Sequence, residues 1–182
     1  MLTELVHVMT DPRFDRRTRL ARLQGWRGAD LDQALQAGWA LSLAPAVCGA
    51  GGLLGGFLQS PLVLGLLGVT AVIGVVAANQ PFEVLYNAIA RRIGRSEVPP
   101  NRAAKRLGCF LGSVHLIGAT VAFELGATTL GLVLSLSLGG LATFVALSGI
   151  CVPSMLYTLF FGAERATGST LLGSRPAAVH GG

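Results

Sequence analysis

The stretch Arg91–Arg106, RRIGRSEVPPNRAAKR, carries six positively charged side chains and lies between long apolar segments of the chain. Charged side chains are disfavoured in the hydrocarbon core of a bilayer, so we expect this stretch to stay in water. Upstream lie apolar runs at about residues 37–58 and 61–79, and downstream lie two more at about residues 103–125 and 129–153. Each run approaches the roughly 20 residues that a helix needs to cross a bilayer. The stretch therefore separates two pairs of predicted transmembrane helices.

The composition also indicates a membrane protein. Of the 182 residues, 52% are hydrophobic and 13% are charged, whereas soluble domains carry about 25% charged residues. We predict an all-α integral membrane protein with a four-helix transmembrane domain over residues 34–162. We expect a basic amphipathic cytoplasmic segment at residues 1–33, an interfacial helix at residues 82–93 between the second and third spans, and a flexible cytoplasmic tail at residues 163–182.

The positive charges fall on one side of this predicted topology. If four spans alternate across the membrane, all fourteen Lys and Arg residues lie on the side of both termini, and cytoplasmic loops are enriched in such residues. We therefore expect a multi-pass protein of the bacterial inner membrane with cytoplasmic N- and C-termini. The arginines expected to anchor it and to meet anionic lipid headgroups are Arg16, Arg17, Arg91, Arg92 and Arg102. The basic segments contain Asp and Glu and lack stacking aromatic residues, so no nucleic-acid partner is expected.

Glycines recur at helical spacing along the predicted spans. Small residues let helix backbones approach closely, and in lipid helix association depends on such packing. The candidate helix-packing positions are Gly51 and Gly55 in the first span, Gly108 and Gly112 in the third, and Gly139 and Gly149 in the fourth run. We interpret these faces as contacts with protein, including other membrane protein subunits. Pro153 is expected to kink or break the long fourth run.

Few side chains indicate chemistry. Cys48, Cys109 and Cys151 all lie in apolar runs, at spacings that match neither a zinc site nor a disulfide framework, so no metal is predicted. His115 lies inside the third span, where an ionisable residue is a candidate functional group. A neutral imidazole hydrogen-bonded to a neighbouring helix explains it, and axial ligation of a haem or chlorophyll-type pigment is the alternative. No catalytic arrangement is recognisable, and we predict no cofactor.

Two segments resemble a known family: PPNRAAKRLG at residues 99–108, and GICVPSMLY at residues 149–157. They are similar to a bacterial four-span family known as domain of unknown function 4395, and the likeness covers roughly residues 33–162. That family typically has an Arg-containing segment before its third span, a position that Arg102 matches. It also carries a Gly-aromatic-Cys-x-x-Cys-x-x-Tyr element at the end of its fourth span.

The second element is only partly present. Gly149, Cys151 and Tyr157 match the family positions, but Ser154 stands where the family has its second cysteine. A disulfide within this motif is therefore impossible. Some members of the family look associated with rhodanese-like or thioredoxin-like domains, which implies sulfur or thiol handling for them.

These observations lead to two main hypotheses and a minor one. The first is a non-catalytic membrane scaffold or accessory subunit whose small-residue faces pack against a larger complex. The second is a thiol- or sulfur-handling membrane component that uses Cys151, with Cys109 as its possible second thiol, and a reducible bond from Cys151 to another cysteine would favour it. The minor hypothesis is pigment or haem binding through His115. The sequence favours the first, because the second cysteine of the motif is absent.

The charge distribution generates a direct test of topology. Reporter fusions placed after Gln59 and after Ala127 are expected to report the outside of the membrane, and fusions after Glu97 and after Gly182 the cytoplasm. Alkaline phosphatase and a fluorescent protein, which are active on opposite sides, measure both outcomes. A reversed signal at any one position contradicts the predicted topology.

Overall fold

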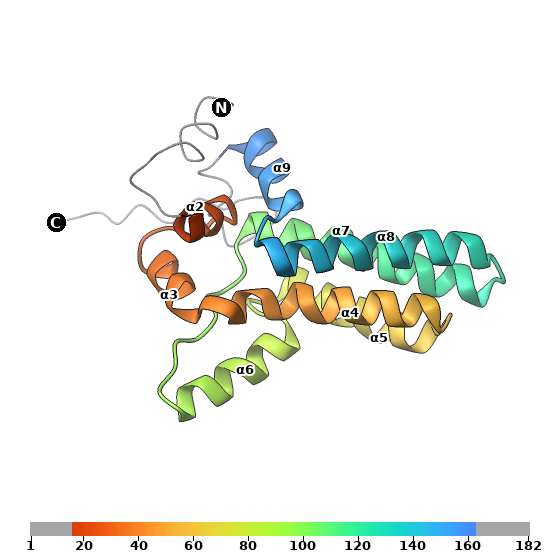
Figure 1. Cartoon of the computed structure of the whole chain (residues 1–182), viewed down its shortest axis with the longest axis horizontal. Helices are drawn as coiled ribbons and strands as arrows, with labels where there is room; N and C mark the ends of the chain where they lie inside the picture. The colour runs from red at the N-terminus through yellow and green to blue at the C-terminus, as the bar shows by residue number, and fades with distance from the viewer. Residues whose placement is uncertain (1–15, 163–182) are drawn as a thin grey trace.

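The structure is a computed structural model that describes residues 16–162, and it is helical throughout these residues apart from short connections (Figure 1). The predictions for residues 1–15 and for the tail at 163–182 lie outside the described residues. The elements in chain order are α2 (Arg16–Leu23), α3 (Ala29–Ala37), the 3-10 helix η1 (Gly38–Ser42), α4 (Leu43–Phe57), α5 (Pro61–Val76), α6 (Pro81–Arg92), α7 (Ala103–Glu124), α8 (Thr128–Ser148) and α9 (Val152–Phe161).

Four of these helices, α4, α5, α7 and α8, run side by side as an elongated bundle (Figure 1). The main contacts are those of α4 with α8 and of α5 with α7. We call the end at which α2, α3, α6 and α9 gather the polar end. The opposite end is the far end, where residues 58–60 join α4 to α5 and residues 125–127 join α7 to α8.

Local sequence explains the turn between α4 and α5. Ser60 is the N-cap of α5, and its hydroxyl oxygen accepts the backbone N–H of Val63 at 3.4 Å. Pro61 takes the first helical position, where its missing N–H costs nothing. The short connection makes α4 and α5 antiparallel neighbours.

Small residues bring α4 and α8 together. A Cβ atom added to Gly52 would lie 3.3 Å from the Cα of Gly139, and one added to Gly56 would lie 2.5 Å from Ser135 Oγ. Backbones can approach this closely only where side chains are absent or short. The other helix pair uses aliphatic side chains, and a buried cluster joins α5 to α7: Leu64, Ala71, Leu116 and Ala119.

The long helices are apolar enough to cross a membrane. Three helical segments meet the requirements of length and composition: Ala29–Phe57, Ala103–Glu124 and Thr128–Ser148. α5 and α6 meet them only together, and they are bent by 71° relative to each other. The chain is therefore a multi-pass membrane protein whose described residues contain three spans, or four if α5 and α6 form one broken span.

The prediction that Pro153 breaks the fourth run is wrong about the position of the break. α8 ends at Ser148, and Gly149 adopts a left-handed conformation with φ of 73° while donating its N–H to the carbonyl of Val145 at 2.8 Å. Glycine adopts this helix-ending geometry without a steric penalty. Pro153 lies instead in the first turn of α9, where proline fits.

α6 is amphipathic, as expected of residues 82–93, but its buried face is polar. Glu83 and Asn87 are buried against the rest of the chain, whereas Leu85 and Ile89 are exposed. Tyr86 is half-buried and forms an edge-to-face contact with Trp39, with ring centroids 5.8 Å apart. The exposed leucine and isoleucine leave an apolar strip on the outer surface of α6.

Neighbouring glycines on α8 allow a controlled test of the α4–α8 contact. A Cβ at Gly139 would lie 2.8 Å from the backbone nitrogen of Leu53, whereas one at Gly140 would meet nothing within 4 Å. Gly139→Leu is therefore expected to lower the free energy of unfolding by about 1–3 kcal/mol through overpacking. Gly140→Leu is expected to leave it unchanged or to raise it slightly. Thermal unfolding in one detergent measures both, and equal stabilities would contradict the close helix contact.

Candidate functional site

A buried ion pair joins α6 to α7 at the polar end. Lys105 Nζ lies 2.6 Å from Glu83 Oε1, and the Glu83 side chain is completely buried. The other carboxylate oxygen, Oε2, accepts the backbone N–H of Gln80 at 3.0 Å, which is the return half of a capping box at the start of α6. Pro81 starts the helix without an N–H that needs a partner. Both oxygens of the buried carboxylate are thus engaged.

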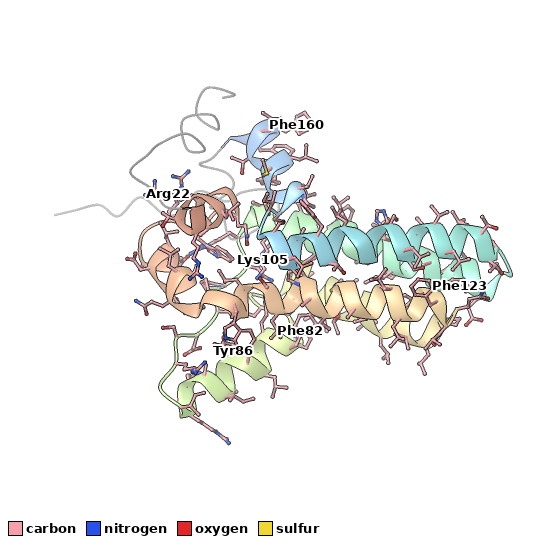
Figure 2. All side chains as sticks on the ribbon, in the orientation of Figure 1. Arg22, Phe82, Tyr86, Lys105, Phe123 and Phe160 are labelled. Carbon is pink, nitrogen blue, oxygen red and sulfur yellow. The ribbon has the colours of Figure 1, made fainter. Side chains whose placement is uncertain are left out.

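Trp26 covers the same ammonium group. It is fully buried in the connection between α2 and α3, and Lys105 Nζ lies 5.5 Å from the centroid of its ring. At this distance the face of an indole attracts a cation. The indole N–H donates to the carbonyl of Pro100 at 3.4 Å. Figure 2 shows Lys105 at the polar end, between the bundle helices and α2 and α3.

The connection from α6 to α7 is hydrogen-bonded to residues that precede it in the chain. The Asn87 side chain donates to the Val98 carbonyl at 3.0 Å and accepts the Val98 N–H at 2.7 Å. The N–H of Asn101 donates to the carbonyl of Ala78 at 2.6 Å. Because these bonds satisfy buried backbone groups, the connection lies against the bundle as an ordered part of the fold.

The expectation that the whole stretch Arg91–Arg106 stays in water is therefore wrong for its last part. Lys105 and Arg106 are each 8% exposed. Arg102, expected to meet lipid headgroups, forms an ion pair with Asp30 of α3. The partners that make burial possible come from distant parts of the chain. The first half of the stretch does remain exposed, and Arg91 makes only a surface ion pair with Glu97 at 3.7 Å.

A cavity of about 770 Å³ lies beside this ion pair. We call it the thiol cavity, because all three cysteines line it: Cys48 of α4, Cys109 of α7, and Cys151 just before α9. Lys105 and Gln80 line it as well. Its volume is in the range of about 300–1,000 Å³ that is typical of small-molecule sites. The remaining lining is mostly apolar and comes from every described helix except α6.

Polar groups contact two of the three sulfur atoms. Gln80 Nε2 donates to Cys109 Sγ at 3.0 Å. Ser154 Oγ lies 3.0 Å from Cys151 Sγ and 3.1 Å from the carbonyl oxygen of Ala104 on α7, and its single proton serves one of them at a time. All three cysteines are free thiols. Among residues 16–162, no three metal-ligating side chains come close enough to hold an ion.

Two of the predicted helix-packing glycines shape this cavity. A Cβ at Gly108 would lie 3.8 Å from Pro153 and 3.9 Å from Cys151 Sγ, and one at Gly112 would lie 4.0 Å from Leu138. These distances are ordinary van der Waals contacts. Unlike Gly52 and Gly139, which permit close backbone contact, the glycines on α7 leave space that the cavity occupies.

The other predicted site residues lie elsewhere. Gly51 and Gly55 of α4 face leucine side chains of α5, and Gly149 ends α8 beside Leu20. His115 is not part of the cavity lining, and its Nδ1 lies 2.8 Å from the carbonyl oxygen of Leu111 in its own helix. Arg17, by contrast, lines the cavity and is exposed, whereas the side chain of Arg16 is outside what the structure describes.

Sequence reasoning missed several residues of the site: Trp26, Cys48, Gln80, Glu83 and Lys105. A signal existed for two of them, since Gln80-Pro81-x-Glu83 has the spacing of a capping box, of which the hydrogen bond from the Gln80 N–H to the Glu83 carboxylate is formed. The sequence pattern places Lys105 only in a basic stretch between two apolar runs. Nothing local in the sequence indicates that Cys48 and Cys109, 61 residues apart in the numbering, share one cavity.

Comparison with known proteins gives a family match. A family model described as Domain of unknown function (DUF4395) matches residues 40–161. This confirms the resemblance drawn from the segments at 99–108 and 149–157. No curated protein and no solved structure matches the chain.

The ion pair can be tested against a surface pair of the same kind. Glu83→Gln leaves the Lys105 ammonium buried without a counter-charge and is expected to cost about 3–5 kcal/mol of unfolding free energy. Glu97→Gln breaks the exposed pair with Arg91 and is expected to cost at most about 1 kcal/mol. Denaturation in detergent compares the two. The combination of Glu83→Gln with Lys105→Met should recover much of the loss, and a double variant as unstable as Glu83→Gln alone would contradict the buried pair.

Proposed function

Since the chain belongs to the family described as domain of unknown function 4395, we propose its role from the thiol cavity. It is a thiol-dependent membrane component in which Cys109 and Cys151 act on a small molecule held between the helices. The observation that carries this proposal is the convergence of three thiols from separate segments on one cavity of ligand size.

Two cysteines of different helices can replace the pair that the motif lacks. Ser154 occupies the second cysteine position, but Cys109 lines the same cavity as Cys151. Cys151 is also the N-cap residue of α9, and helix N-termini stabilise nearby negative charge.

The reaction class that such a pair supports is thiol–disulfide exchange. The thiolate of Cys151 attacks one sulfur of a small disulfide, and the other sulfur leaves as a thiolate. Cys109 then attacks Cys151 Sγ in the mixed disulfide and releases the remaining half of the small molecule as a second thiol. The two cysteines are left joined by a disulfide, so the small molecule is reduced by two electrons.

The scaffold hypothesis is less well supported by the packing. The small-residue faces of α4 and α8 contact each other through Gly52 and Gly139 and are therefore not free to bind another subunit. Gly108 and Gly112 line the cavity. For His115, the described residues offer no second histidine that could complete bis-histidine ligation of a haem.

We further propose that the polar end faces the cytoplasm. The exposed arginines of α6, Arg91 and Arg92, lie on the same helix as the exposed side chains of Leu85 and Ile89. Cytoplasmic segments are enriched in Lys and Arg, and a basic amphipathic helix is suited to the headgroup region of a bilayer. α6 thereby rests in the interface, and α4, α5, α7 and α8 form four spans.

The thiol proposal predicts a specific cross-link. Reduced protein treated with dithiodipyridine is expected to acquire a disulfide between Cys109 and Cys151 and to keep no pyridyl group on either residue, because the second thiol displaces it. Cys109→Ser is expected to retain a pyridyl adduct on Cys151, whereas Cys48→Ser serves as the control and should still form the cross-link. Peptide mapping with and without reductant measures the products. Stable pyridyl adducts on both residues of the unaltered protein would contradict the proposal.

A further inference from the structure

The thiol cavity has an apolar opening. Among its lining residues, Trp39 of η1 and Leu141 and Leu147 of α8 are exposed, by 64%, 40% and 85%. Leu141 lies within a segment that is long and apolar enough to cross the membrane. α4 and α8 pack closely through Gly52 and Gly139 and again through Gly49 and Thr143, so the opening lies beyond Thr143, between η1 and the last turn of α8 at the polar end. A molecule dissolved in the bilayer can reach the cavity from this side.

The inner wall contains a polar group without a partner. Gln80 is 3% exposed and lines the cavity, its amide nitrogen donates to Cys109 Sγ, and its side-chain oxygen Oε1 has no hydrogen-bond partner among the described residues. If the amide is rotated by half a turn, the Cys109 thiol donates to the oxygen and the amide N–H groups lose their acceptor instead. In either orientation a buried polar group lacks a partner, which is unfavourable. A hydroxyl group, which both donates and accepts, satisfies either orientation.

The charges around this wall favour an uncharged ligand. The ammonium of Lys105 is already matched by the Glu83 carboxylate at 2.6 Å, so the inner end of the cavity has no unmatched charge from this pair. Arg17 lines the cavity but is exposed to solvent. An ionic head group would lose its hydration at the inner wall without gaining a counter-charge there.

We propose that the cavity is a binding site for a lipid-soluble, uncharged molecule whose hydroxyl-bearing head contacts Gln80 beside Cys109 and whose apolar body lies along Leu138, Leu141 and Val145. The ligand enters from the bilayer between η1 and α8. This deepens the proposed function by naming the class of molecule that reaches the thiols. It is tested by binding alone, without thiol exchange.

The experiment uses Cys109 as the only reactive reporter. The variant Cys48→Ser/Cys151→Ser is placed in lipid nanodiscs, and the rate of alkylation of Cys109 by N-ethylmaleimide is measured with and without amphiphiles of equal chain length: decanol, decanoate and decyltrimethylammonium. Decanol is expected to slow alkylation severalfold, whereas the two ions have little effect. Because this variant cannot form the Cys109–Cys151 disulfide, its outcome is independent of thiol exchange.

Variants that fill the cavity provide the matched controls. Gly112→Leu and, from the opposite wall, Leu138→Phe are expected to abolish the protection by decanol, whereas Gly140→Leu, which meets nothing within 4 Å, should preserve it. Gln80→Met should weaken the protection by removing the hydrogen-bonding head contact. Thermal unfolding confirms that each variant is folded. Equal protection by decanoate, or protection that survives both filling variants, would overturn the proposal.

Discussion

The ion pair between Lys105 and Glu83 is the constraint on which the polar end depends. Two opposite charges removed from water are tolerated only when they are close together and their remaining hydrogen-bonding capacity is used. Here the carboxylate also accepts a helix N-cap N–H, and the face of Trp26 covers the ammonium. α6 must therefore bend away from α5 and return to α7, and the connection between α2 and α3 must close over the pair. The arrangement of the helices around the thiol cavity is thus set by the need to keep this ion pair buried and hydrogen-bonded.

Glycine has two opposite effects in this bundle, and the difference depends on what lies across from it. Gly52 on α4 faces Gly139 on α8, so the backbones touch and the helices are held together near their middles. Gly108 and Gly112 on α7 face side chains that stay at van der Waals distance, so the missing Cβ atoms leave empty volume. The same composition thus produces tight packing in one helix pair and a ligand-sized space in the neighbouring one.

The membrane helices could be predicted from the sequence because hydrophobicity and helix length are local properties of a segment. The family could also be predicted, because its motifs are short and contiguous. The site could not, since it depends on partners that are remote in the chain. The pattern around Lys105 resembles that of a loop, because its partner Glu83 lies on another helix. Likewise, the motif around Ser154 does not indicate that its hydroxyl contacts the carbonyl of Ala104 on α7. The fourth run breaks at Gly149 and not at Pro153, because glycine adopts the left-handed conformation that ends a helix, whereas proline is accommodated in the first turn of the next one.

The shortness of α5 has a consequence for the proposed four-span arrangement. It contains 16 residues and therefore rises about 24 Å, less than the roughly 30 Å of a typical hydrocarbon core. The 71° bend after it prevents α6 from supplying the missing length along the same axis. In the proposed four-span arrangement, lipids beside this helix would have to compress or tilt to cover it, and such hydrophobic mismatch favours thinner bilayers. Local thinning of this kind would bring the headgroup region and its water closer to the polar end, and the buried charges and thiols would then lie at a shallow depth.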